Sequence, residues 1–201
     1  MNCTETVGES RYVAAPIPPV DNKKKERPMA PVPDTPDQFK TRVDRCKRKL
    51  APDIIDNAGR EHAKYLVEAL LDVAASKKEP VVIVTGVFDP GFYGDLVASF
   101  QKCVNAGVTI DVIVLDGSRL DSHPITKAIS SPRLSVRTID SMQDPETATA
   151  PHFVLVGDRR YRLERDHDHD IAVASFNDVQ MGRWLKSIYA WLVERLTKNA
   201  A

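Results

Sequence analysis

The sequence predicts an α/β fold in which a mixed, mostly parallel sheet is flanked by helices. One observation is a β-branched run, Val81–Thr85, followed by a helix-like segment over Asp95–Asn105 and a second apolar run over Val108–Leu115. A strand, a helix and a strand within about 35 residues form a right-handed parallel crossover. The other observation is a set of short apolar runs from Leu134 onward, which are typical of strands. After the last run, the spacing of apolar residues predicts an amphipathic helix over Val179–Thr197.

The remaining elements follow from the spacing of apolar residues. Along residues 37–50 they recur at steps of four, three and four, which predicts a basic helix with one apolar stripe. The stripe consists of Phe39, Val43, Cys46 and Leu50. Further elements are predicted, in chain order, as a helix over about Asn57–Ser76, a short helix around His123–Ile129, an outer or edge strand over Leu134–Ile139, a hairpin of Phe153–Val156 with Tyr161–Leu163, and a strand over Ile171–Phe176.

The N-terminal 37 residues differ from the rest in composition, since they contain 7 of the chain's 14 prolines. Proline fixes φ and removes a backbone donor, and this segment has few large apolar residues to bury. We therefore expect a disordered, Pro-rich basic arm over residues 1–37 and one α/β domain over residues 38–201. The Lys23–Lys25 run is either a solvated linker or a contact for phosphates or a protein partner.

Composition excludes several classes of protein. The 28 Lys and Arg residues balance 28 Asp and Glu residues, so net charge does not draw the chain to nucleic acid or to an anionic membrane. No apolar run reaches the roughly 18–20 residues that a membrane span needs, and the N-terminus lacks the profile of a secretory signal. The three scattered cysteines form neither a disulfide framework nor a CxxC metal site. A cytoplasmic location is therefore expected.

The most informative motif combines a histidine, an aspartate and a Ser-x-Asn segment. His152 opens a predicted strand, Asp158 lies in the turn that closes it, and Ser175 and Asn177 end a later strand. Over residues 60–197, this order of elements resembles one half of the phospholipase D-like superfamily. That superfamily carries a His-x-Lys-x4-Asp motif followed by Gly-Ser-x-Asn.

The resemblance implies a role for each matching residue. His152 stands at the nucleophilic histidine, which forms a covalent phosphoryl intermediate, and Asp158 would orient its imidazole although it comes one residue early. Ser175 and Asn177 match the segment that holds the phosphate. An imidazole fixed by a carboxylate attacks phosphorus, while a hydroxyl and an amide donate to the phosphate oxygens. This chemistry needs neither a metal nor a cofactor.

The sequence departs from the family motif at three points. Val154 occupies the position of the lysine, Ala174 replaces the glycine, and an acidic insertion lengthens the segment before Ser175. Arg159, Arg160 or Arg162 is available to replace the missing cation, and Arg160 is the predicted phosphate ligand. Side chains alternate faces along a strand, so at most one or two of these arginines point inward.

Two other segments carry candidate groups. In Asp166–Asp170, histidine and aspartate alternate, which is a ligand set for Zn²⁺ or Mn²⁺, but a solvated polar loop is the favoured interpretation. The loop Gly86–Asp95 leaves the carboxyl end of a predicted parallel strand, where open α/β sheets bind ligands. Its glycines match neither a dinucleotide-binding fingerprint nor a P-loop.

Two classes of function stay open. In the first, the chain is a degenerate phospholipase D-like module that binds phosphodiesters, nucleic acid or a protein without turnover. In the second, it is a metal-independent nuclease or phosphodiesterase that works through a phosphohistidine at His152. Because one copy contributes only one motif to the family's two-motif site, the resemblance also implies a homodimer.

Overall fold

The computed structural model describes most of the α/β domain, and its compact unit spans residues 33–201. The described residues are 35–57, 59–116, 120, 123–139, 146–166 and 171–199. Residues 1–34 of the expected basic arm and residues 167–170 of the acidic insertion therefore lie outside the described residues.

A seven-stranded mixed sheet forms the centre of the domain, in the order β1-β7-β6-β5-β2-β3-β4. Helices flank it, which confirms the predicted α/β fold class. The strands are β1 (Ile55–Asn57), β2 (Val81–Thr85), β3 (Ile110–Val114), β4 (Leu134–Thr138), β5 (Phe153–Val156), β6 (Arg160–Asp166) and β7 (Ile171–Ser175).

The prediction of a mostly parallel sheet is wrong. Only β2–β3 and β3–β4 pair in parallel, whereas the other four pairings among the described strands are antiparallel. The parallel pairs β2–β3 and β3–β4 are joined by crossovers that contain α4 and α5, whereas a tight turn joins β5 to the antiparallel β6. The antiparallel pairs β1–β7 and β2–β5 bring together strands that lie far apart in the sequence, which no local pattern indicates.

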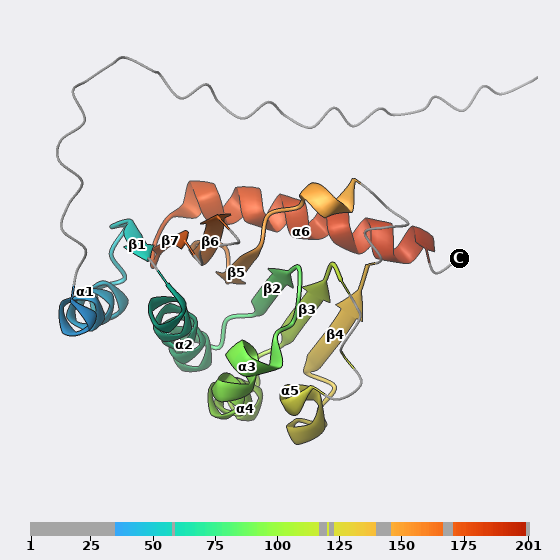
Figure 1. The fold of residues 1–201 in the computed structure, drawn as a ribbon, viewed down its shortest axis with the longest axis horizontal. Helices are drawn as coiled ribbons and strands as arrows, with labels where there is room; N and C mark the ends of the chain where they lie inside the picture. Colours follow the sequence, from blue (N-terminus) through green and yellow to red (C-terminus); the bar gives the residue numbers. More distant parts are fainter. Residues whose placement is uncertain are drawn as a thin grey trace, which may run out of the picture. The chain divides into compact units, whose positions relative to one another are not determined.

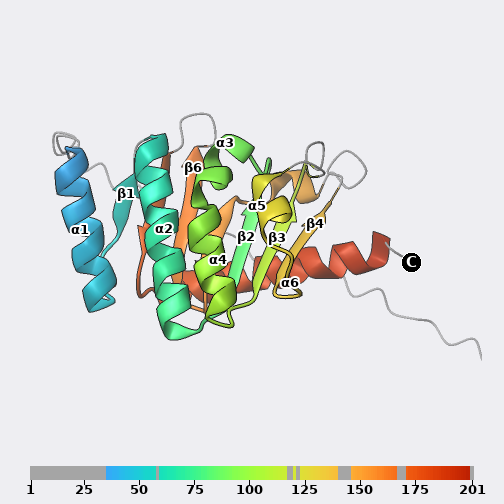
Figure 2. The ribbon, with the colours of Figure 1, turned by 90° about the horizontal axis from the view of Figure 1, so that it is seen from below.

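Helices cover both faces of the sheet. Figure 1 shows α6 alone on one face and the other α-helices on the opposite face, and Figure 2 looks onto that second layer, where α1, α2 and α4 lie side by side. The helical elements are α1 (Pro36–Lys49), α2 (Arg60–Lys77), α3 (Pro90–Tyr93), α4 (Val97–Asn105), α5 (Pro124–Ala128) and α6 (Val179–Asn199), with 3₁₀ turns η1 (Gly94–Leu96) and η2 (Thr147–Thr149). None of the described helices is long and apolar enough to cross a membrane.

The first helix forms as its sequence predicts. Thr35 accepts a hydrogen bond from the backbone N–H of Gln38, whose side chain in turn accepts one from the Thr35 N–H, so a capping box starts the helix. The predicted stripe is buried at Phe39, Val43 and Cys46. Packing of this narrow stripe against α2 holds α1 to the domain.

The second helix begins three residues later than predicted. Its expected start, Asn57, belongs to β1 and pairs with Ala172 of β7. A strand of three residues leaves no periodic signal of its own, so it becomes visible only through this pairing. Asn57 is thereby placed at the sheet, where its side chain takes part in the site described below.

Side chains on β5 alternate between two cores, and this alternation positions the site. Phe153 and Leu155 pack in the core beneath α6, whereas Val154 and Val156 pack in the core beneath α2 and α4. Because successive residues of a strand point to opposite faces, His152 belongs to the same face as Val154. The partners of His152 must therefore come from the α2 side of the sheet.

Candidate functional site

A histidine and a glutamate meet at the start of β5. His152 directly precedes that strand and lies opposite Glu164 of β6, whose backbone N–H donates to the His152 carbonyl oxygen over 3.0 Å. Nδ1 of the imidazole lies 3.1 Å from Oε2 of Glu164. The side chains are mostly buried, with 19% and 17% of their surface exposed. The carboxylate therefore fixes the orientation of the imidazole ring.

A buried arginine holds the same carboxylate from its other side. Arg162 donates from Nη1 to Oε1 of Glu164 over 2.9 Å, and from Nε to Oδ1 of Asn57 over 3.3 Å. Only 5% of its side chain is exposed. Asn57, His152, Arg162 and Glu164 thus form one connected polar cluster, the His152 network, built from β1, β6 and the start of β5.

The network lies beside the carboxyl end of β2. A Cβ atom placed on Gly86, the residue after β2, would come within 2.8 Å of Cε1 and 3.1 Å of Nε2 of His152. The imidazole edge opposite Glu164 therefore rests against the Gly86 backbone. Burial raises the pKa of Tyr93 to about 12, although the nearby Arg162 charge opposes the rise. Tyr93 is therefore a neutral neighbour of the network at physiological pH.

This geometry orients an imidazole, and the arginine linked to it through Glu164 is buried. In the tautomer in which Nδ1–H donates to Glu164, the Nε2 lone pair points along the edge that faces Gly86. In enzymes, a carboxylate that binds one nitrogen of a histidine ring prepares the other ring nitrogen to accept a proton or to attack an electrophile. The guanidinium of Arg162, however, is directed at Glu164 and Asn57.

The predicted orientation of His152 by Asp158 is wrong. Asp158 lies in the β5–β6 turn, at the end of β5 opposite to His152. Its Oδ1 accepts a hydrogen bond from Nε of Arg159 over 2.8 Å, and this bond lowers the pKa of the carboxyl group. Glu164 takes the orienting position instead.

The Ser-x-Asn segment is also separated from His152. Ser175 pairs with Tyr161, near the turn end of β6, whereas Glu164 lies toward the other end of that strand. Ser175 is fully buried, and its hydroxyl accepts a hydrogen bond from the Asn177 backbone N–H over 3.3 Å. Ala174 belongs to the core on the α2 side, so its neighbour Ser175 faces α6. The structure therefore does not bring Ser175 and Asn177 to the histidine.

Arg160, the predicted phosphate ligand, forms a structural ion pair. Its guanidinium contacts the Glu79 carboxylate, and 6% of its side chain is exposed. Arg160 lies opposite Val156, and Arg162 lies opposite Val154, two residues closer to His152. The arginine beside the histidine is therefore Arg162, one of the three that the sequence offered.

Sequence reasoning missed Glu164 and Asn57, although a signal for Glu164 is present. A hairpin that turns around Asp158 places residues opposite each other when they are equally far from the turn. His152 and Glu164 are each six positions from Asp158, so the turn position alone points to their pairing. Asn57 carries no comparable signal, because β1 is recognisable only in the folded sheet.

The other two candidate segments, the loop after β2 and the acidic insertion, are weaker candidates for a ligand or metal site. In the loop after β2, Asp89 accepts from the Gly91 N–H over 2.9 Å as the cap of α3, and it pairs with Nη2 of Arg60 at 2.6 Å. These contacts explain its lowered pKa despite partial burial, which opposes the shift. In the described part of the chain no three His, Cys, Asp or Glu side chains lie close enough to hold a metal ion. Residues 167–170 of the acidic insertion lie outside that part.

Comparisons with known proteins give matches only at the level of structure. Neither family models nor curated protein sequences match the chain. NucT from Helicobacter pylori is similar over 71% of this chain and 96% of its own, with a TM-score of 0.53 and 12% identity. TrmBL2, described as an archaeal chromatin protein with a novel mode of DNA binding, is similar over 78% of this chain, with a TM-score of 0.51 and 12% identity.

Sequence identities of 12% establish the fold alone. This chain spans 59% of the TrmBL2 chain and 96% of the NucT chain. The similarity confirms the resemblance seen in the sequence, and the chain has a phospholipase D-like α/β fold.

Proposed function

We propose that the chain is a phospholipase D-like module that binds nucleic acid through its phosphodiester backbone without cleaving it. The observation that carries this proposal is that the Arg162 guanidinium is buried and already bound to protein groups. Only 5% of the side chain is exposed, and its guanidinium donates to Glu164 and Asn57. The Arg162 cation, which the Glu164 carboxylate links to His152, is thus directed at protein groups and not at a phosphate.

Energetics favour binding over catalysis. Breaking a buried ion pair by removing one partner costs about 3–5 kcal/mol, so Arg162 would not leave Glu164 without compensation to meet a phosphate. Val154 supplies no charge, and Ser175 faces the other side of the sheet. Losing even one preorganised electrostatic donor typically lowers the rate of a reaction by about 10²–10³-fold.

Similarity of fold supports a nucleic-acid ligand. One structural neighbour, TrmBL2, is described as binding DNA in a novel mode. The proposal carries this ligand class, not that binding mode, to the present chain. A polyanion also suits the basic surface of α1, which is described in the next subsection.

An active metal-independent nuclease or phosphodiesterase is the second candidate, and one observation favours it. The 3.1 Å contact between His152 and Glu164 orients the imidazole as a nucleophile requires. In that reaction Nε2 attacks phosphorus, the bond to the leaving oxygen breaks, and water then hydrolyses the phosphohistidine. The leaving oxygen must also gain a proton, which is why this candidate requires a second copy of the chain.

A cleavage assay separates the two candidates. Single- and double-stranded DNA are incubated with the protein and with the His152→Ala variant in EDTA, and binding is measured in parallel by fluorescence anisotropy. The binding module predicts bound, intact DNA with both proteins. Cleavage that resists EDTA and disappears with His152→Ala would establish the enzyme and overturn the first proposal.

Two partner proposals accompany this function. A homodimer would place two His152 residues near a two-fold axis, and sedimentation equilibrium at tens of micromolar would reject it if only monomer appeared. Capture of a protein partner through the basic arm, residues 1–37, is tested by deleting residues 1–34. This deletion leaves Thr35 and the capping box of α1 in place. Retained capture by the truncated chain would reject the proposal.

A further inference from the structure

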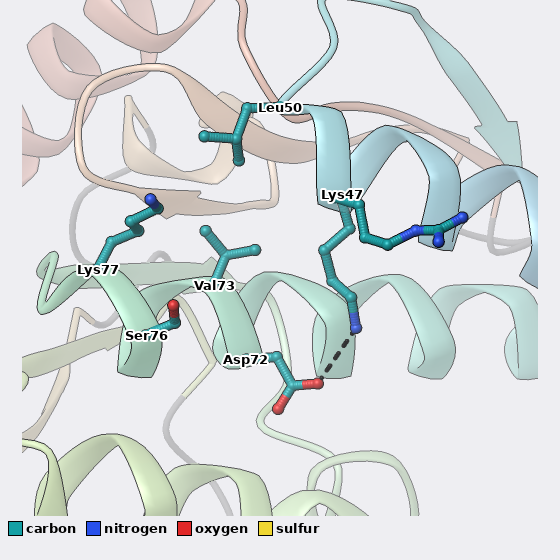
Figure 3. Close-up of a pocket in the computed structure, with 7 residues that line it drawn as sticks. Lys47, Leu50, Asp72, Val73, Ser76 and Lys77 are labelled. Atoms are coloured by element: carbon teal, nitrogen blue, oxygen red, sulfur yellow. Dashed lines mark hydrogen bonds and ion pairs between the residues drawn. The ribbon is translucent and has the colours of Figure 1, made fainter.

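A pocket of about 290 Å³ lies between the C-terminal ends of α1 and α2. Lys47 and Arg48 of α1 and the C-cap residue Leu50 line one side of it, and Asp72, Ser76 and Lys77 of α2 line the other. Figure 3 shows Lys47 reaching across from α1 to Asp72, with Lys77 farther along α2. This volume corresponds to roughly ten water molecules, which is room for a phosphate group and part of the attached sugar.

Positive charge dominates this pocket. Its one carboxylate, Asp72, already accepts from Nζ of Lys47 over 3.3 Å and from Nζ of Lys102 over 2.7 Å. Burial raises the pKa of Asp72, but the two lysines outweigh it and lower the pKa overall, so the group stays ionised. Arg48 and Lys77 are exposed and form no ion pair within the described part of the chain. Two cations at the pocket are therefore available to an anion.

The surface leading to the pocket is basic as well. Helix α1 carries six Lys and Arg residues against two Asp residues, while the whole chain is neutral. Four of these cations are exposed along the helix: Lys40, Arg45, Arg48 and Lys49. Such a strip follows a charged backbone better than it binds a single small anion.

The helix dipoles account for only part of this charge. The C-terminal end of a helix carries roughly half a negative elementary charge, which favours a nearby cation. Two such ends, ionised Asp72, and Asp44, which lies 3.7 Å from Lys47, together amount to about three negative charges, whereas the side chains of Lys47, Arg48, Lys77 and Lys102 carry four positive ones. The surplus remains for a ligand.

We propose that the pocket between α1 and α2 binds a phosphate of a nucleic-acid backbone, with Arg48 and Lys77 as its ligands. This inference rests on the proposed function and names the surface that performs it, on α1 and α2 and away from the His152 network. A guanidinium contacts two phosphate oxygens at once, and an ammonium contributes a point charge. Ser76 adds a hydroxyl donor at the same rim.

The test compares two double variants with equal changes in charge. Arg48→Gln/Lys77→Gln removes the two pocket cations, and Lys127→Gln/Lys186→Gln removes two exposed lysines from α5 and α6. Fluorescence anisotropy measures binding of a short labelled oligonucleotide, single-stranded and as a duplex, over a series of salt concentrations. Unlabelled polyglutamate is the competitor for a general preference for anions. Urea unfolding verifies that both variants fold.

We expect the pocket variant to bind at least tenfold more weakly and to reduce the slope of log affinity against log salt by roughly 1 to 2. The control variant should bind within about twofold of the parent, since its cations lie far from the pocket. Equal loss in both variants, or displacement of the oligonucleotide by polyglutamate as readily as by DNA, would overturn the inference. A parent chain that binds no nucleic acid would overturn the proposed function itself.

Discussion

Val154 of β5 and Arg162 of β6 lie opposite each other on the face of the sheet that α2 covers. The family motif has a lysine where this chain has valine, and the residue opposite that valine on the neighbouring strand is the cation Arg162. That cation is held by Glu164 and Asn57. The positive charge is thus present near His152, but it stabilises the sheet.

Removing Arg162 should therefore affect stability strongly. Arg162→Met leaves the Glu164 carboxylate buried without its cation, and we expect the free energy of unfolding to fall by about 3–5 kcal/mol. The double variant Arg162→Met/Glu164→Gln removes the stranded charge and should recover part of this loss. Urea unfolding of both variants and of Glu164→Gln alone gives the coupling energy. A loss below about 1 kcal/mol in Arg162→Met would contradict a structural role for the pair.

Gly86 should tolerate no side chain. The Cβ atom of alanine would come within 2.8 Å of the His152 ring, so the imidazole must move away from Glu164 or the strand end must shift. Such overpacking typically costs about 1–3 kcal/mol. NMR of the His152 ring resonances and urea unfolding check both effects. Gly91→Ala is the matched control, because its Cβ meets only the ends of side chains, Nη2 of Arg60 at 3.2 Å and the Asp89 carboxylate at 3.5 Å and beyond. Unchanged His152 resonances in Gly86→Ala would refute the contact.

A second glycine seats α6 on the sheet. A Cβ atom on Gly182 would lie 2.1 Å from the backbone oxygen of Asp158, which belongs to the β5–β6 turn and cannot swing aside. Alanine ordinarily stabilises a helix by about 1 kcal/mol relative to glycine. Here we expect the opposite sign, a loss of about 2–3 kcal/mol in Gly182→Ala measured by thermal or urea unfolding. A gain in stability would show that α6 does not approach the turn this closely.

Stability should depend on His123 in weakly acidic solution. Burial lowers the pKa of His123 from its ordinary value of 6.5, and Nδ1 accepts a hydrogen bond from the Ile125 N–H over 3.2 Å. The unfolded chain therefore takes up the proton first, so the contribution of His123 is complete above about pH 6.5 and is lost as pH falls through the folded-state pKa. The carboxyl groups of Asp72 and Asp89 titrate below 3.8, outside this range.

The measurement is urea unfolding of the parent and of His123→Asn between about pH 7 and pH 5. Asparagine keeps a cap acceptor for α5 but does not titrate. The parent should lose stability over this range more steeply than the variant. Parallel pH profiles would mean that His123 binds its proton equally in both states.

Local patterns predicted the elements that depend on local sequence. The apolar stripe of α1 and the β-branched run of β2 both lie where their spacing indicated. The predicted hairpin is confirmed, although β6 extends to Asp166. Strand direction was not predicted well, because the order of β5 and β2 within the sheet is a tertiary property that no single segment encodes.

The site was predicted only in part, and the alternation of strand faces explains the failure. Motif spacing singled out His152, whose imidazole lies against a carboxylate, although that carboxylate is Glu164 and not Asp158. It also grouped His152 with Asp158 and Ser175, which lie at the other end of their strands and, for Ser175, on the other face. Distance along a chain does not carry that information, whereas strand register does.

The central claim is that the chain binds nucleic acid without forming a covalent intermediate at His152. It is tested most directly by mass spectrometry of the protein mixed with a short DNA strand, first under native and then under denaturing conditions. We predict a non-covalent complex that dissociates to a chain of unmodified mass. A covalent phosphoryl adduct that survives denaturation and is absent from His152→Ala would contradict the claim.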